Sequence, residues 1–277
     1  VAEDGFIYGS IGGGVMEYSL VEEIKELLKN ENQAIFFRKQ IHQGTGKDKS
    51  GMICSGEQTV VFHPLNSEHI SLIEKILVYS QTNNRKTLSF SPNSIEFTQH
   101  KIENKYETQI IDKNQWEFKE LIGFKETLYI VGGGHVGLAV SQLFRQLDFH
   151  VIVFDNRPHL NTFDDNTFAH KKEVIDYISI ANFIKEGNDC FIAIMTNKYT
   201  DDKLVLSKLL RKKHKFIGVL GSKAKLKTMW EVLLKKGFSS KELEKVHAPI
   251  GIHIKSETPE EIAVSIASEI IQIKNNS

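Results

Sequence analysis

The chain has 277 residues, 40% of them hydrophobic, and its 35 Lys and Arg side chains balance 35 Asp and Glu side chains. This length predicts about two globular domains, and the charge balance argues against a nucleic-acid-binding protein, which typically carries an excess of basic residues. No apolar run reaches the ~20 residues that span a bilayer, and the N-terminus does not resemble a signal peptide. We therefore expect a cytoplasmic protein that binds neither nucleic acid nor a membrane.

Two cysteines, Cys54 and Cys190, are too few for a disulfide framework, and no Cys-x-x-Cys or paired histidine spacing predicts a zinc site. At the N-terminus, Asp4-Gly5 predicts a hairpin turn whose first strand would lie mostly before Val1. We therefore expect the natural chain to begin upstream of this residue.

The first part of the chain predicts a mixed α+β domain that ends near Phe124, over residues 1–124. Its predicted elements are a strand, a helix, two strands and a helix, over residues 6–8, 16–28, 34–41, 59–63 and 69–79. Three alternating segments around Leu88, Ile95 and Ile110 then predict a small antiparallel sheet, which is followed by the stretch from Lys113 to Lys125.

The second part, residues 125–277, opens with a strand, a glycine-rich turn, a helix and a second strand. The turn is Gly132-Gly133-Gly134-His135-Val136-Gly137, between a predicted strand at 127–132 and a helix at 136–147. In such a Gly-x-Gly-x-x-Gly loop the first glycine permits a tight turn, the second lets backbone approach a pyrophosphate, and the third packs helix on strand. These spacings predict a dinucleotide-binding βαβ unit.

The second strand of this unit, at residues 150–154, ends at Asp155. An acidic residue about 20 positions after the glycines would accept the hydroxyls of an adenosine ribose. Asp155 therefore favours NAD, although Arg157 could lie against an adenine or bind a 2′-phosphate, so NADP stays open.

The remaining predicted elements alternate between helix and strand. They are a short helix, a buried strand, a helix, a strand and two helices, over residues 180–186, 190–195, 202–212, 216–220, 223–236 and 259–274. Thr258, Pro259 and Glu261 predict a capping box at the start of the last helix. This alternation predicts a Rossmann-like, doubly wound parallel sheet.

Several residues are candidates for chemistry. Cys54, between Gly51 and Gly56, could be an exposed thiolate that ligates a soft metal or carries sulfur, or an inert thiol, whereas Cys190 starts an apolar strand and is expected in the core. Gly12, Gly13 and Gly14 precede a helix and could hold an anion or form only a tight turn. Ser222 follows a predicted strand, where ligands bind in such sheets.

Three further patterns are weaker. Ser222 and Lys225 form a Ser-x-x-Lys pair, but the other elements of penicillin-binding enzymes are absent, and these lysines could be a solvated helix face. Tyr199 and Lys203 match the proton-relay spacing of short-chain dehydrogenases, although Tyr199 is predicted in a turn. His247, on a Pro- and Gly-containing turn, could contact a ligand.

Taken together, these segments resemble the XdhC/CoxI family of accessory factors for xanthine dehydrogenase and related molybdenum hydroxylases. The resemblance is carried by both glycine loops, the Cys54 loop, Asp155-Asn156-Arg157-Pro158, residues 218–225 and residues 247–261. It covers nearly the whole chain and is weakest over residues 65–124.

The resemblance implies a chaperone that binds the molybdenum cofactor (molybdopterin), assists its sulfuration with a cysteine desulfurase, and inserts it into a xanthine dehydrogenase-type molybdoenzyme. Catalysis by the chain itself is not implied, and a homodimer is compatible with the resemblance. On this hypothesis Cys54 contacts the metal centre while the glycine loops, with Gly132, Gly134, His135 and Gly137, hold the pterin and phosphate groups.

The chain departs from the family pattern at two places. Family members usually have a cysteine where this chain has Val15, and a Thr-His-x-His element where it has Asn197 and Tyr199. Cys54 is then the remaining soft ligand. Two alternatives stay open, an NAD(P)-dependent oxidoreductase and a scaffold that docks a hydroxylase without holding a cofactor.

Overall fold

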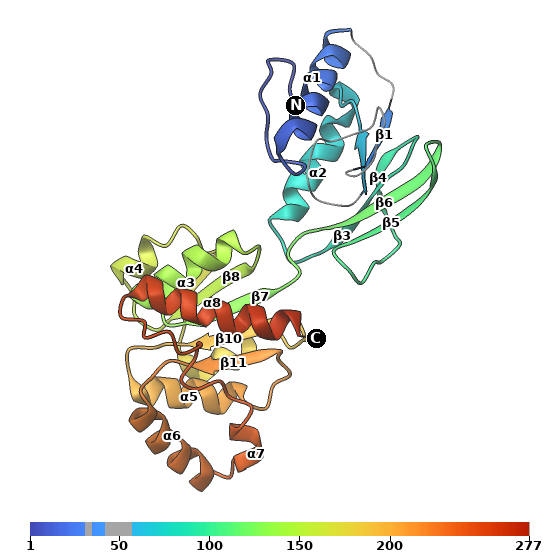
Figure 1. Ribbon diagram of the computed structural model, residues 1–277. Coiled ribbons are helices and arrows are strands. Elements are labelled where there is room, and N and C mark those ends of the chain that lie inside the picture. Colours follow the sequence, from blue (N-terminus) through green and yellow to red (C-terminus); the bar gives the residue numbers. More distant parts are fainter. Residues whose placement is uncertain (31–34, 42–56, 277) are drawn as a thin grey trace. The chain divides into compact units, whose positions relative to one another are not determined.

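The computed structural model describes residues 1–30, 35–41 and 57–276 (Figure 1). They belong to two compact units, one of residues 1–76 with 87–120 and the other of residues 77–86 with 121–277. The short segment 77–86 thus belongs with the C-terminal part of the chain. Each unit is described by itself below.

The C-terminal unit is built on a five-stranded parallel sheet. Its strands are β7 (Thr127–Val131), β8 (His150–Asp155), β9 (Lys171–Val174), β10 (Cys190–Ile194) and β11 (Phe216–Val219). They lie in the order β11-β10-β7-β8-β9, and every neighbouring pair is parallel. The chain runs outward from β7 to β9 and then returns to the other side of β7. The order therefore reverses between β7 and β10, which is where ligands bind in such sheets.

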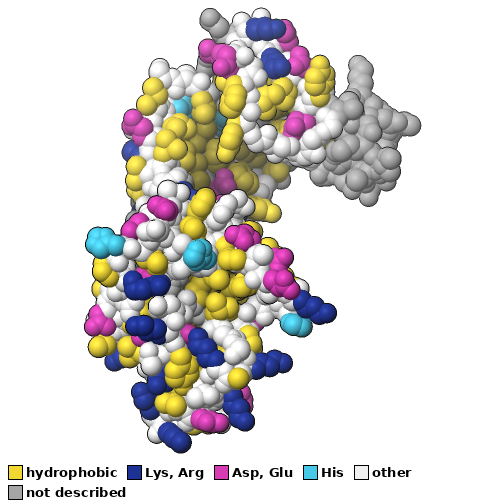
Figure 2. Space-filling view, turned by 90° about the vertical axis from the view of Figure 1, so that its left-hand side faces the viewer, with side chains coloured by type: hydrophobic (Ala, Val, Ile, Leu, Met, Phe, Trp, Pro, Cys, Tyr) yellow, Lys and Arg dark blue, Asp and Glu magenta, His cyan; other side chains and the backbone are white. Residues whose placement is uncertain are grey.

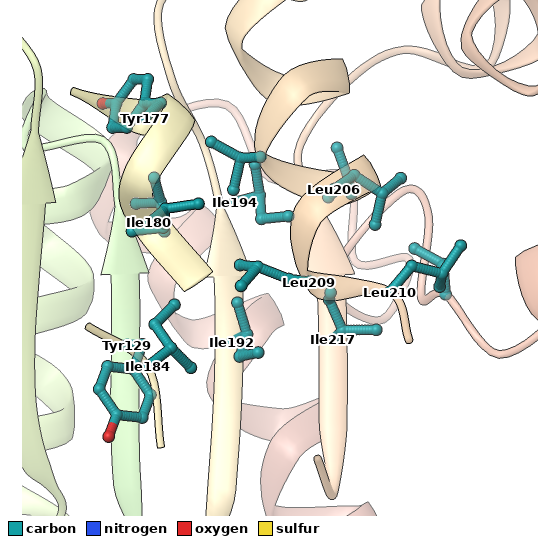
Figure 3. Close-up of a cluster of buried hydrophobic side chains, with 14 of the residues drawn as sticks. Tyr129, Tyr177, Ile180, Ile184, Ile192, Ile194, Leu206, Leu209, Leu210 and Ile217 are labelled. Carbon is teal, nitrogen blue, oxygen red and sulfur yellow. The ribbon is translucent and has the colours of Figure 1, made fainter. Parts of the chain in front are cut away.

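Helices cover both faces of this sheet (Figure 1). They are α3 (His135–Gln146), α4 (Asn161–Asp164), η2 (Tyr177–Asn182), α5 (Tyr199–Leu209), α6 (Lys223–Lys235), α7 (Ser240–Leu243) and α8 (Pro259–Asn275). Successive residues of β10 point to opposite faces. Ile192 and Ile194 join a buried cluster with Leu206 and Leu209 of α5 (Figure 3). Phe191 instead packs in a second cluster, with residues of α3 and α8. This confirms the predicted doubly wound sheet.

The first part of the chain is a mixture of helices and antiparallel strands. Its elements are α1 (Gly14–Lys29), β1 (Phe36–Ile41), β2 (Glu57–Phe62), η1 (Ser67–His69), α2 (Ile70–Ser80), β3 (Lys86–Phe90), β4 (Ile95–Thr98), β5 (Tyr106–Asp112) and β6 (Gln115–Ile122). Strands β1 and β2 form an antiparallel pair, and the other four form a sheet in the order β4-β3-β6-β5. The predicted α+β character is confirmed.

Some predicted elements are wrong. Residues 6–8 form no strand, and Phe6 and Tyr8 are 64% and 90% exposed. The helix predicted at 180–186 is instead a 3-10 helix at Tyr177–Asn182, capped by Asp176, whose carboxylate accepts from the Ile178 amide at 2.9 Å. Strands β6 and β9 were not predicted.

Candidate functional site

The candidate site lies at the edge of the parallel sheet where the strands end. Because all five strands are parallel, the residues that follow β7, β8, β10 and β11 meet at this one edge. The structure thus brings Gly132, Gly134, His135, Gly137 and Asp155 to the same edge. Ser222, which follows β11, lies at this edge too, beyond β10 from the glycine loop.

The three glycines of the motif have different surroundings. Gly132 has φ 118°, and a Cβ there would lie 2.3 Å from the Met195 carbonyl oxygen. A Cβ on Gly137 would lie 2.2 Å from the carbonyl oxygen of Gly132, so α3 packs directly on the loop. A Cβ on Gly134, in contrast, would meet nothing within 4 Å. Gly132 and Gly137 are therefore required by the fold, and the space beside Gly134 is open.

The N-terminus of α3 presents unpaired backbone donors. The first helical hydrogen bond of α3 is donated by the Leu138 amide to the Gly134 carbonyl at 2.9 Å. Among the described residues, the amides of Gly134, His135 and Val136 have no hydrogen-bond acceptor. His135 itself is exposed. Free amides and the helix dipole together favour an anionic group at this position.

Asp155 ends β8 fully buried, and the chain's own donors saturate its carboxylate. Oδ2 accepts from the Gly133 amide at 2.7 Å and from Arg157 Nη2 at 2.8 Å. Oδ1 accepts from the amide and Nε of Arg157 at 2.9 and 2.8 Å. Burial opposes ionisation of Asp155, but these hydrogen bonds outweigh it and hold the pKa of the carboxyl below its usual range.

A second buried acid at this edge was not predicted from the sequence. Asp202, on α5, is fully buried and accepts from the amide and hydroxyl of Thr196 at 2.9 and 2.6 Å. Its other oxygen accepts from Lys225 Nζ at 2.5 Å. The signal was Lys225 itself, which the sequence analysis considered as part of a Ser-x-x-Lys pair or of a solvated helix face but not as the partner of a buried acid. Ser222 is the N-cap of α6, and its hydroxyl accepts from the Lys225 amide at 3.3 Å.

The structure explains Tyr199 and Lys203 without a proton relay. Tyr199 is the first residue of α5 rather than part of a turn. The Lys203 ammonium lies over the face of its ring, 5.2 Å from the centroid, and the buried phenol oxygen has no hydrogen-bond partner among the described residues. A relay would instead need the ammonium near a phenol oxygen that faces substrate.

His247 also has a structural role. Its ring stacks on Phe216 with centroids 4.6 Å apart, and Nδ1 lies 2.9 Å from Glu269 Oε1. The other oxygen of Glu269 accepts from the Gly251 amide at 2.6 Å. The two hydrogen bonds to Glu269 hold the segment from His247 to Gly251 against α8. At the start of α8 the predicted capping box of Thr258 and Glu261 is present.

In the first part of the chain, the loop before α1 donates hydrogen bonds to a carboxylate of α1 itself, that of Glu17. Glu17 Oε2 accepts from the Ser10 hydroxyl at 2.5 Å and from the amides of Ile11 and Gly13 at 2.6 and 3.3 Å. The hydroxyl of Ser10 and the two amides together hold the pKa of Glu17 below its usual range. Of the loop glycines predicted to face a cofactor phosphate, Gly13 thus donates to the chain's own carboxylate, and the Gly12 amide donates to the Ser10 hydroxyl at 3.2 Å.

The surface of the C-terminal unit is rich in lysine over α6 and α7, at the bottom of the space-filling view (Figure 2). Lys223 and Lys227 are exposed, as expected of a solvated helix face, whereas Lys225 is half-buried in its ion pair. Within residues 1–30, 35–41 and 57–276, every helix is too short or too polar to cross a membrane.

A family model described as the XdhC Rossmann domain matches residues 128–270, which is just over half of the chain and includes the whole glycine loop, Asp155 and the His247 segment. The chain belongs to the XdhC family. The resemblance drawn from the motifs is confirmed by this match.

Two curated relatives are longer than this chain. It is 27% identical over 280 residues to "Uncharacterized protein YqeB" of Escherichia coli (strain K12), covering all of this chain and 40% of that protein. It is 29% identical over 161 residues to a probable xanthine dehydrogenase subunit of Bacillus subtilis (strain 168), covering 57% of this chain and 46% of that protein. The chain thus spans less than half the length of either relative.

A solved structure has the same fold. A crystal structure described as a xanthine dehydrogenase from Bacillus halodurans superposes with a TM-score of 0.71 at 21% identity, and the match covers 99% of this chain and 84% of that one. At this identity the likeness concerns the fold of the XdhC-type chain.

Of the two cysteines of this XdhC chain, only Cys190 lies within the described residues. Cys54, the candidate soft ligand, lies outside the described residues. Cys190 is 3% exposed in β10, and burial raises the pKa of its thiol to about 12, so it is the inert core residue that was predicted. Within the described ranges, no group of three or more His, Cys, Asp or Glu side chains could hold a metal ion.

Proposed function

We propose that this protein is an accessory factor of a xanthine dehydrogenase-type molybdenum hydroxylase. It would bind the molybdenum cofactor, assist its sulfuration together with a cysteine desulfurase, and insert it into the apo-enzyme. The observation that carries this proposal is the match of residues 128–270 to the XdhC Rossmann domain. The name of the Bacillus subtilis relative, a probable xanthine dehydrogenase subunit, supports the choice of partner.

The residues at the sheet edge fit the anionic part of this cofactor. Molybdopterin carries a phosphate, and the amides of Gly134, His135 and Val136 are donors without an acceptor among the described residues. The space beside Gly134 would let a phosphate approach the backbone closely. When bound, the cofactor would supply the molybdenum centre on which the hydroxylase depends.

The thiolate of Cys54 remains the proposed contact to molybdenum, because thiolates are soft ligands. Its counterpart in the described region, Cys190, is buried and cannot take this role without unfolding of β10. The loop before α1 would receive a phosphate only if the anion displaced Glu17 from the donors of Ser10, Ile11 and Gly13.

The alternative of an NAD(P)-dependent oxidoreductase is weakened in one respect. The Lys203 ammonium lies over the Tyr199 ring and the phenol oxygen of Tyr199 is buried, so this pair lacks the geometry of the proton relay that this alternative would have used. The glycine loop alone does not establish hydride transfer, because the same loop serves for binding without catalysis. We therefore place cofactor binding and transfer ahead of a redox reaction.

The test of this proposal is anaerobic binding of molybdopterin by the wild-type protein and by Cys54→Ala, with Cys190→Ala as the matched control. We expect saturable binding by wild type and Cys190→Ala, and at least tenfold weaker binding by Cys54→Ala. Equal affinity of all three proteins would remove Cys54 from the site. Docking to a hydroxylase without any cofactor binding would favour the scaffold alternative.

A further inference from the structure

The ion pair of the buried Asp155 and the partly exposed Arg157 changes which ligand the end of β8 can bind. In a dinucleotide site the acid at this position accepts both ribose hydroxyls. Here four donors, three of them from Arg157, already occupy both carboxylate oxygens. A ribose diol would have to break a bidentate, charge-assisted pair in order to reach a carboxylate with no exposed surface.

Arg157 is the member of the pair that faces outward. Its side chain is 34% exposed, against 0% for Asp155. Nε and Nη2 are turned to the carboxylate, and Nη1 has no acceptor among the described residues. A guanidinium has five N–H donors in a planar fork that matches an oxyanion. The chain therefore offers a fixed cationic group where a ribose would otherwise meet an acid.

Apart from Asp155, two groups of the described chain interact with the Arg157 guanidinium, Asp201 and Tyr177. Asp201 is the other carboxylate that interacts with the guanidinium, and it accepts from the Asn156 side chain at 3.2 Å. Tyr177 lies close by and is buried, and burial keeps its phenol neutral by raising its pKa. Strand β8 neighbours β7, so the open amides at the start of α3 belong to the same edge.

We propose that the C-terminal unit binds a nucleotide whose ribose carries a 2′-phosphate, with Arg157 as the specificity-determining residue and Asp155 as the positioning residue that holds the guanidinium. The diphosphate of this ligand lies at the amides of Gly134, His135 and Val136, and the 2′-phosphate accepts from Arg157. This nucleotide site goes beyond the accessory function, which is tested by the binding of molybdopterin. Both proposals use the amides of Gly134, His135 and Val136, so the two ligands would compete there.

The test compares NADPH with NADH as probes, because they differ by the 2′-phosphate alone. Titration calorimetry on the wild-type protein is expected to give NADPH an affinity at least tenfold higher than that of NADH. Equal affinities, a preference for NADH, or no binding of either probe at millimolar concentration would overturn the proposal, whatever the result with molybdopterin.

Variants assign the preference to individual residues. We expect Arg157→Gln to bind NADPH and NADH equally, and Arg157→Lys to keep part of the preference, because a lysine retains the charge but not the fork. Asp155→Asn should lower the NADPH to NADH ratio, a readout that a merely structural role would not move. If folded Arg157→Gln protein still binds NADPH at least tenfold more tightly than NADH, Arg157 is not the specificity-determining residue. If a variant fails to fold, the comparison of NADPH with NADH on the wild-type protein decides the proposal.

Discussion

At Gly134 the chain leaves room that a methyl group could fill, whereas at Gly137 it does not. A Cβ on Gly134 would meet nothing within 4 Å, and its φ of −70° is accessible to any residue. A Cβ on Gly137 would lie 2.2 Å from a backbone oxygen of the loop. The two positions therefore separate the requirements of folding from those of ligand approach.

We predict that Gly134→Ala leaves the free energy of unfolding within about 1 kcal/mol of wild type, while it weakens binding of molybdopterin or a nucleotide at least tenfold. Gly137→Ala is expected to lower the free energy of unfolding by about 1–3 kcal/mol, because the added methyl overpacks the contact between α3 and the loop. Urea unfolding and titration calorimetry measure both effects. A destabilised Gly134→Ala protein, or unchanged ligand affinity, would contradict this account.

His170 makes a pH-dependent contribution to stability. Burial lowers the pKa of His170 to about 4, with smaller contributions from Arg145 and His150. An unfolded chain would protonate this histidine near its ordinary pKa of 6.5. The unfolded state therefore binds more protons between these values, and the free energy of unfolding should fall as the pH drops from 6.5 towards 4.

The Val151 amide donates to Nδ1 of His170 at 3.0 Å. The variant His170→Asn tests the prediction, because the asparagine side-chain oxygen can accept this hydrogen bond but does not titrate. Urea unfolding at pH 7, 5.5 and 4.5 should show a smaller loss of stability in this variant than in wild type. Identical pH dependence of the two proteins would show that His170 does not carry the effect.

Helices α5 and α6 are joined by the ion pair of Asp202 and Lys225. Asp202 has no exposed surface, and it accepts from the amide and hydroxyl of Thr196 and from the ammonium of Lys225. Removal of the lysine would leave a buried carboxylate paired only with Thr196. Such a change is costly because the desolvated charge loses its compensation.

We predict that Lys225→Met lowers the free energy of unfolding by about 2–3 kcal/mol, less than for a fully buried pair because Lys225 is 28% exposed. The control is Lys227→Met, which removes an exposed lysine from the same helix and should change stability by less than about 0.5 kcal/mol. Thermal unfolding compares the two variants. An equal loss of stability in the two variants would show that the ion pair of Asp202 and Lys225 does not stabilise the fold.

Strong periodicity made most elements of the C-terminal unit predictable. Val140 and Phe144 lie on the buried face of α3, and β10 is apolar throughout because helices cover both faces of its sheet. Strand β9, with the sequence Lys-Lys-Glu-Val, was missed because it is an edge strand, and edge strands are often charged. Residues 6–8 look like a strand, but no partner strand pairs with them in the described chain.

Side-chain pairing at the site could not be predicted in the same way. The spacing placed Asp155 at the end of β8, but nothing in it showed that Arg157 and Gly133 would occupy the carboxylate. The hydrogen bond from the Gly13 amide to Glu17 could not be predicted either, because a separation of four residues is common to all neighbours along a helix. These contacts depend on loop conformation, which sequence periodicity does not describe.

At the scale of the whole molecule, the chain combines two compact units with different candidate groups. One contains the loop before α1 and, outside the described residues, Cys54. The other contains the XdhC Rossmann domain with the open amides at the start of α3. A cofactor accessory role needs both a soft ligand for the metal and donors for the phosphate.

The most direct measurement is the activation of a cofactor-free xanthine dehydrogenase-type hydroxylase by the full chain preloaded anaerobically with molybdenum cofactor. We expect hydroxylase activity to rise at least tenfold faster than with free cofactor at the same concentration, and Cys54→Ala to lose this gain while Cys190→Ala keeps it. Activation at the same rate with and without the protein would contradict the accessory function.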